Sequence, residues 1–72
     1  MITVTERVDP VVQALFRKAN EQGLLGKELA ARSGVGYDAF WKWRRGHSPR
    51  LVNLVAALEA VGLRLKVEEV ER

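Results

Sequence analysis

Four of the six glycines in this chain of 72 residues each follow a run of apolar residues with helical spacing. Glycine commonly ends a helix because it adopts the left-handed backbone conformation without a steric penalty. Regular stops of this kind are typical of short helices joined by tight turns. The pattern predicts four helices, which end at Gly23, Gly34, Gly46 and Gly62.

The first helix has the clearest start. Asp9 is suited to the N-cap, where its carboxylate accepts hydrogen bonds from free amides, and Pro10 fits the first helical position. The segment Thr3-Val4-Thr5-Glu6 is a competing start that resembles a capping box, but no periodic run follows it directly. The run after Pro10 carries one apolar stripe, formed by Val12, Leu15, Phe16 and Ala19.

The next three helices are shorter or less sharply bounded. The second spans "LLGKELAARSG", and its spacing places Leu25, Leu29 and Ala30 toward the core. The third runs from about Tyr37 to Arg45. The fourth is expected to open with Ser48 as the cap and Pro49 in the first turn, and it continues to Val61.

The C-terminal segment follows a different period. Its residues alternate apolar and charged: Leu63, Leu65 and Val67 against Arg64, Lys66 and Glu68. This period of two indicates a half-buried strand. A lone strand is not stable in water, so it should pair with residues 2–4 or with a second copy of the chain across a two-fold axis. The prediction is one domain over residues 1–72, mainly α-helical, with four helices and a C-terminal β-strand.

Positive charge is concentrated in the middle third of the chain. Residues 27–50 hold six basic residues against two acidic ones, whereas the remainder holds six basic and seven acidic residues. The formal net charge of the whole chain is only +3. A local excess of this kind is typical of a surface that meets a polyanion.

The same third contains four of the five aromatic residues, all within the predicted third helix. At about 100° per residue, one side of that helix carries Ala39, Phe40 and Trp43, which should face the core. The opposite side carries Tyr37, Asp38, Trp41, Lys42 and Arg45. Packing therefore accounts for two of the rings, and the other two should face solvent beside cations.

The second and third helices are joined by Ser33-Gly34-Val35-Gly36, which must turn sharply. Such a turn needs a small residue where the helices touch, here Ala30, and a glycine where the backbone turns, here Gly34. This arrangement predicts a helix-turn-helix whose second helix suits the DNA major groove.

The segment "GKELAARSGVGYDAFWKWRRG" resembles the helix-turn-helix of the phage Cro and repressor family, also called the XRE or lambda-repressor-like family. The resemblance covers about residues 9–61. The matching positions are Leu29-Ala30, Gly34-Val35, Phe40, Trp43 and Gly46.

This resemblance implies a sequence-specific regulator of transcription, most often a repressor, that binds double-stranded DNA as a homodimer. The base-contacting residues it implies are Tyr37, Asp38, Trp41 and Lys42. The residues it places at phosphates are Gly26, Lys27, Ala39, Arg45, His47, Ser48 and Arg50.

Some roles stay open at this point. Trp41 could touch a thymine methyl group, or it could pack against the N-terminal segment or a partner chain. Asp38 could accept a hydrogen bond from a cytosine amine, or it could stabilise the positive end of its own helix. The alternative function is an antitoxin or phage assembly adaptor, which would bind a toxin or another phage protein through Trp41 and the C-terminal strand.

Composition argues against several other classes. The chain has no cysteine and a single histidine, His47, so it offers no recognisable set of metal ligands, and we expect no metal or cofactor. No nucleophile is paired with a base, so we do not expect an enzyme. The first ten residues do not resemble a signal peptide and no segment is long enough to span a membrane, which favours a cytoplasmic protein. The family resemblance implies a phage or prokaryotic one.

Overall fold

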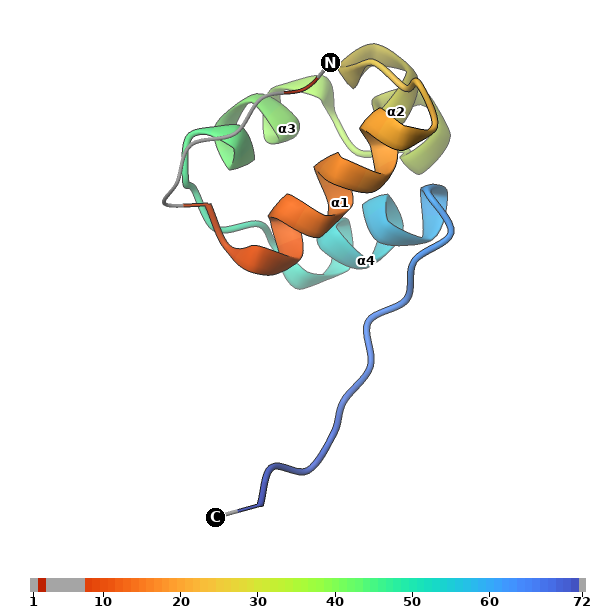
Figure 1. The fold of residues 1–72 in the computed structure, drawn as a ribbon. Coiled ribbons are helices and arrows are strands. Elements are labelled where there is room, and N and C mark those ends of the chain that lie inside the picture. The colour runs from red at the N-terminus through yellow and green to blue at the C-terminus, as the bar shows by residue number, and fades with distance from the viewer. Residues whose placement is uncertain (1, 3–7, 72) are drawn as a thin grey trace.

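The computed structural model describes residue 2 and residues 8–71 of the chain, and it is mainly helical within them. Within these residues the predicted number of helices is confirmed, and Figure 1 shows their arrangement. They are α1 (Pro10–Glu21), α2 (Gly26–Ser33), α3 (Tyr37–Arg44) and α4 (Leu51–Ala60). In the part of the chain that the structure describes, no helix is both long and apolar enough to cross a lipid bilayer.

Helix α1 begins where the sequence predicts. The Asp9 carboxylate accepts a hydrogen bond of 2.8 Å from the Val11 amide, and Pro10 occupies the first helical position. The competing start at residues 3–6 lies outside the described residues. The predicted apolar stripe is buried in full, comprising Val12, Leu15, Phe16 and Ala19.

The four helices share one apolar core. Helix α4 packs against α2 and α1, while α3 packs against α2. Phe40 lies at the centre, with its ring 6.3 Å from that of Phe16 and 5.0 Å from that of Trp43, both in edge-to-face geometry. Burial of side chains of this size stabilises the fold by about 1.5–3 kcal/mol each, so these rings hold α3 firmly to the body.

The connection between α2 and α3 is a tight turn at Gly34, which has a φ of 75°. Its amide donates a hydrogen bond of 2.9 Å to the Ala30 carbonyl, and the Val35 amide donates one of 3.1 Å to Ser33 Oγ. Val35 is buried, so it anchors the turn to the core. The other glycines expected to end helices, Gly23, Gly46 and Gly62, also have positive φ.

Two expectations about helix starts are wrong. Helix α4 begins at Leu51 with Arg50 at its N-cap, and Ser48 does not cap it. Pro49 would fit the first helical position, but Arg50 after it keeps an extended backbone with φ −70° and ψ 141°, so the helix can begin only at Leu51. Leu25 was expected to face the core but is 55% exposed, because α2 begins one residue later and Leu25 serves as its N-cap.

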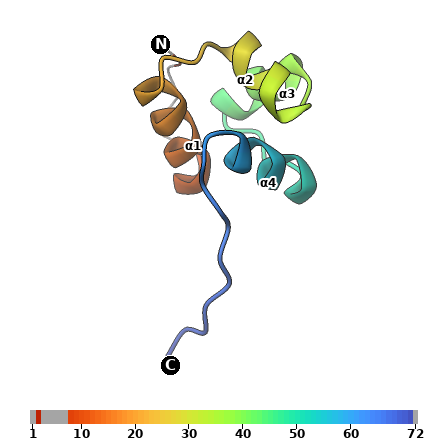
Figure 2. The same ribbon diagram turned by 90° about the vertical axis from the view of Figure 1, so that its right-hand side faces the viewer.

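After Gly62 the chain extends away from the helices in both views (Figures 1 and 2). Leu63 and Leu65, at the start of this segment, are half-buried and still pack against the core. None of the described residues forms a strand. The predicted C-terminal strand therefore has no pairing partner within the described chain. One of its two predicted partners, residues 2–4, falls mostly outside the described residues.

Candidate nucleic-acid interface

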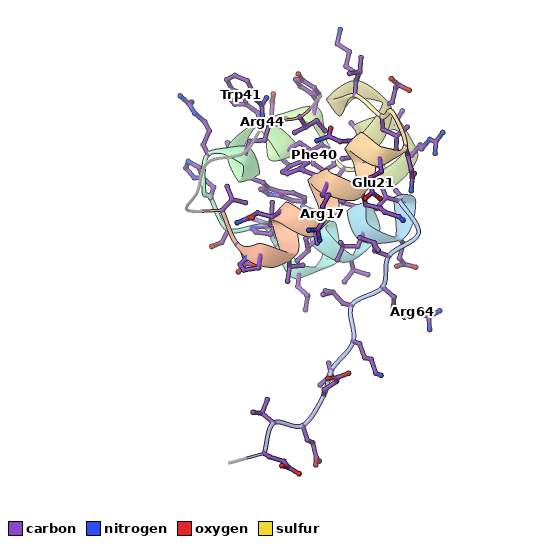
Figure 3. The ribbon with its side chains drawn as sticks, in the orientation of Figure 1. Arg17, Glu21, Phe40, Trp41, Arg44 and Arg64 are labelled. Atoms are coloured by element: carbon purple, nitrogen blue, oxygen red, sulfur yellow. The ribbon has the colours of Figure 1, made fainter. Side chains whose placement is uncertain are left out.

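Helix α3 carries two chemically different sides. Phe40 and Trp43 are only 2% and 4% exposed and lie in the core, as the sequence predicts. Tyr37 and Trp41 are 47% and 48% exposed. Figure 3 shows Trp41 at the outer surface of α3 and Phe40 toward the interior. The core rings fix the rotation of the helix, so its outer side chains face solvent.

The outer side of α3 brings most of the predicted contact residues together. Asp38, Lys42 and Arg45 are exposed beside the two outer rings. The loop that follows α3 continues the same surface, because the His47 amide donates a hydrogen bond of 3.2 Å to the Lys42 carbonyl. The loop residues predicted at phosphates are also exposed: His47, Ser48 and Arg50. Ala39 is half-buried and offers little side-chain surface.

The amino end of α2 meets the amino end of α3 at one close contact. A Cβ atom placed on Gly26 would lie 2.8 Å from Cε2 of Tyr37, so the ring lies directly across the start of α2. Gly26 therefore allows Tyr37 to fold back on α2. Lys27, the next residue, is exposed. The predicted phosphate-contacting pair and the predicted first base-contacting residue thus form one continuous surface.

Trp41 contacts two arginine side chains. The guanidinium carbon of Arg44 lies 5.2 Å from the centroid of the Trp41 ring, and that of Arg45 lies 5.5 Å away. Cation–π contacts at exposed sites contribute about 0.5–1 kcal/mol each. The indole thus contributes to holding both cationic side chains in place. This geometry adds a third role to the two that the sequence left open for Trp41.

Sequence reasoning placed Arg44 only at the margin of the outer side, as a weaker candidate for a phosphate contact than Lys42 or Arg45. The available signal was its spacing, because residues three and four positions after Trp41 lie on the same helical face as the ring. Asp38 lies in the first turn of α3, where a carboxylate also favours the helix dipole, so both of its proposed roles remain compatible with its position.

Ion pairs lie elsewhere in the described part of the molecule. One joins Lys18 to Glu21 on α1 at 3.6 Å, and the other joins Lys66 to Glu68 in the C-terminal segment at 3.4 Å. Lys27, Lys42 and Arg45 therefore form no ion pair with a described carboxylate. Residues 8–71 and residue 2 also contain no group of three potential metal ligands.

Comparison with known proteins adds no family to this picture. The chain matches no protein-family model, and a search of curated proteins finds no match either.

Proposed function

We propose that the chain binds double-stranded DNA sequence-specifically through a lambda-repressor-like helix-turn-helix formed by α2 and α3, and that it acts as a repressor of transcription. The observation that carries the proposal is the division of α3 into a core side and an outer side. Its buried rings hold a short helix at the surface, and its outer side offers polar, aromatic and cationic groups. A projecting helix with this chemistry suits the major groove.

In this proposal, side chains near the start and middle of α3 read base edges. Lys42 donates to guanine O6 and N7, and Asp38 accepts from a cytosine amine. Tyr37 and Trp41 supply apolar contact with thymine methyl groups and the groove wall. Arg44 and Arg45, restrained on the indole, approach the neighbouring phosphates.

Phosphates on either side of the groove fix the position of the helix. Lys27 and the backbone amide of Gly26 contact one strand from the start of α2, where unpaired amides point outward. Contacts to the other strand come from the loop after α3. The residues that make these contacts are Arg45, His47, Ser48 and Arg50. Ala39, on α3, lies against the DNA backbone.

The proposal includes a homodimer, since readers of this class bind two half-sites related by a two-fold axis. Residues 63–71 are the candidate interface. They are extended, residues 63–68 alternate in polarity, and Val67 is 99% exposed. Pairing with the same segment of a second copy would form the predicted C-terminal strand and satisfy its free backbone groups.

Selection of bound duplexes from a random pool tests the function. We expect enrichment of a palindromic motif, with the two half-sites about one helical turn apart or a multiple of it. A protein with Lys42→Ala should select a motif with relaxed preference at one position, while Arg17→Ala on α1 should leave the motif unchanged (Figure 3). Absence of any enriched motif would count against DNA reading.

The exposed C-terminal segment favours a second candidate function. Val67 and Val70 are 99% and 80% exposed, and such a segment also suits the addition of a strand to another protein. The chain would then be an adaptor, such as an antitoxin or phage assembly component. An enriched palindrome and a homodimer in the purified protein support the repressor, whereas a monomer without DNA enrichment supports the adaptor.

A further inference from the structure

The C-terminal segment has two chemically different sides. Leu63 and Leu65 are half-buried against the core, whereas Arg64 is exposed and points away from the helices in Figure 3. Farther along, Lys66 Nζ lies 3.4 Å from Glu68 Oε1, so these two side chains lie on one side of the chain. The segment therefore keeps the two-residue alternation of a strand.

The backbone of this segment is available for pairing. The Leu63 amide donates a hydrogen bond of 2.9 Å to the Leu58 carbonyl. Within the described chain, no backbone hydrogen bond of this kind involves residues 64–71. Free backbone groups on an extended segment favour pairing with a second strand.

Two copies related by a two-fold axis can pair these segments in only a few ways. A parallel arrangement brings each residue beside its own counterpart, so like charges would face each other at Lys66 and at Glu68. An antiparallel arrangement places one residue opposite itself on the axis, and its two neighbours then pair with each other across the axis. The residue on the axis therefore determines every other pair.

The charges of the segment allow only Val67 on the axis. In that register, Lys66 of each copy lies opposite Glu68 of the other, and no like charges are opposed within residues 63–71. Like charges that are directly opposite each other destabilise a pair of strands. The registers excluded on this ground have on the axis residue 64, 66, 68 or 69, each a charge opposite itself, or residue 65 or 70, whose two neighbours carry the same charge.

The ion pair within one copy can form again between two copies. Residues two positions apart on a strand are separated by about 7 Å. Residues directly opposite each other on antiparallel strands have Cβ atoms only about 4.5–5.5 Å apart. Lys66 would thus lie closer to Glu68 of the second copy than to its own Glu68, and the two-fold axis provides this contact twice.

We infer that the C-terminal segments of two copies pair antiparallel about a two-fold axis through Val67, with two Lys66–Glu68 ion pairs across the axis that select the register. The inference rests on the homodimer of the proposed function and adds its geometry. The helices of the two copies lie at opposite ends of the paired segments. A segment with a different order of charges is rejected as a partner, because it would oppose like charges.

Charge reversal tests the register. Lys66→Glu and Glu68→Lys should each raise the Kd of the homodimer by at least about tenfold, because each places two like-charged pairs across the axis. An equimolar mixture of the two variants should recover the dimer, since every pair across the axis is then of opposite charge. The chain with both substitutions should recover it as well. Sedimentation equilibrium measures the Kd, and far-ultraviolet circular dichroism checks the helices.

Two matched controls make the same charge changes outside the segment. Arg32→Glu on α2 and Glu59→Lys on α4 alter exposed residues and should leave the Kd of the dimer unchanged. The direction of pairing has its own measurement, because the chain contains no cysteine. Lys66→Cys mixed with Glu68→Cys should form a disulfide between the two variants faster than either variant forms one with itself, since only the mixed pair is directly opposite.

The outcomes separate this register from the homodimer itself. Single reversals that dimerise like the wild-type chain would overturn the register and leave the homodimer standing. A mixture that does not recover the dimer would overturn it too, as would disulfides that form faster within each cysteine variant. A wild-type chain that sediments as a monomer would refute the homodimer and the inference together.

Discussion

The indole of Trp41 is half-exposed and lies within 5.5 Å of two guanidinium groups. A large exposed ring is unfavourable in water. At this position the ring has a local role, because its contacts reduce the rotamer freedom of two long cationic side chains. Gly26 and Tyr37 give a second example. Because Gly26 has no side chain, the Tyr37 ring can lie against it.

Replacement of Trp41 by alanine should remove the contact of the indole with both arginines. The side-chain Hε resonances of Arg44 and Arg45 should shift, because they lose the ring current, and affinity for DNA should fall by about two- to fivefold per lost contact. NMR spectra of the free protein and titration of the selected duplex measure the two effects. Trp41→Phe should give intermediate values.

Tyr37→Ala is the matched control for this experiment, because Tyr37 is a neighbouring exposed ring with no cation–π contact among the described residues. It should leave the Arg44 and Arg45 resonances unchanged. Unchanged arginine resonances in Trp41→Ala would show that the stacking does not persist in solution.

Arg45→Ala should weaken binding of the duplex and reduce its dependence on salt. A side chain that neutralises one phosphate releases about one counterion, so the slope of log affinity against log salt concentration should flatten by about 1. Binding measured over a series of salt concentrations gives this slope. Arg17→Ala removes the same charge from α1 and should leave the slope unaltered; identical slopes for both variants would remove Arg45 from the phosphate contacts.

At the scale of elements, the unit formed by α2, its turn and α3 depends on one backbone conformation. Gly34 has a φ of 75°, and a Cβ atom there would meet no other atom within 4 Å. The cost of a side chain at this position is therefore conformational and not steric. Gly36, two residues later, has a φ of −60° and caps α3.

Gly34→Ala should lower the free energy of unfolding by about 1–2 kcal/mol, since alanine must adopt a left-handed conformation. Gly36→Ser, which suits an extended N-cap, should change it by only a few tenths of a kcal/mol. Urea denaturation measures both variants, and the dependence on urea should stay constant. Equal losses in the two variants would contradict the role assigned to the Gly34 conformation.

The elements also show what could be predicted from the sequence. Local rules placed Asp9 at its cap and separated Phe40 from Trp41, because helical periodicity alone determines which side is apolar. Leu25 and Ser48 were misplaced because a shift of one or two residues at a helix start changes which way a side chain points. The stacking of Arg44 on Trp41 depends on rotamers, which periodicity does not determine.

At the scale of the whole molecule, the described chain is 41 Å along its longest axis and 23 and 22 Å along the others. The C-terminal segment accounts for this elongation (Figure 2). A strand needs a partner, and within one chain the sequence does not specify where that partner lies. Among the described residues of a single copy, the predicted strand has no partner.

Val67→Asp should convert a homodimer into a monomer. Val67 is 99% exposed in the single chain, so the substitution should leave the helical fold intact while placing like charges at the paired segment. Sedimentation equilibrium gives the mass, and far-ultraviolet circular dichroism checks the fold. Val52→Asp on α4, at a residue 72% exposed, should remain dimeric. A wild-type chain that sediments as a monomer would exclude the tail-paired dimer.

The extended conformation of residues 63–71 has a further consequence for such a dimer. Leu65 is the last residue of this segment that packs against the core. Each residue of extended chain advances about 3.3 Å, so two residues inserted after Leu65 would carry each helical body outward by about 7 Å. Because the alternation repeats every two residues, every later side chain would keep its original face. The protein with the insertion should select operators whose half-sites are more widely separated. The length of this segment would then set the distance between the half-sites.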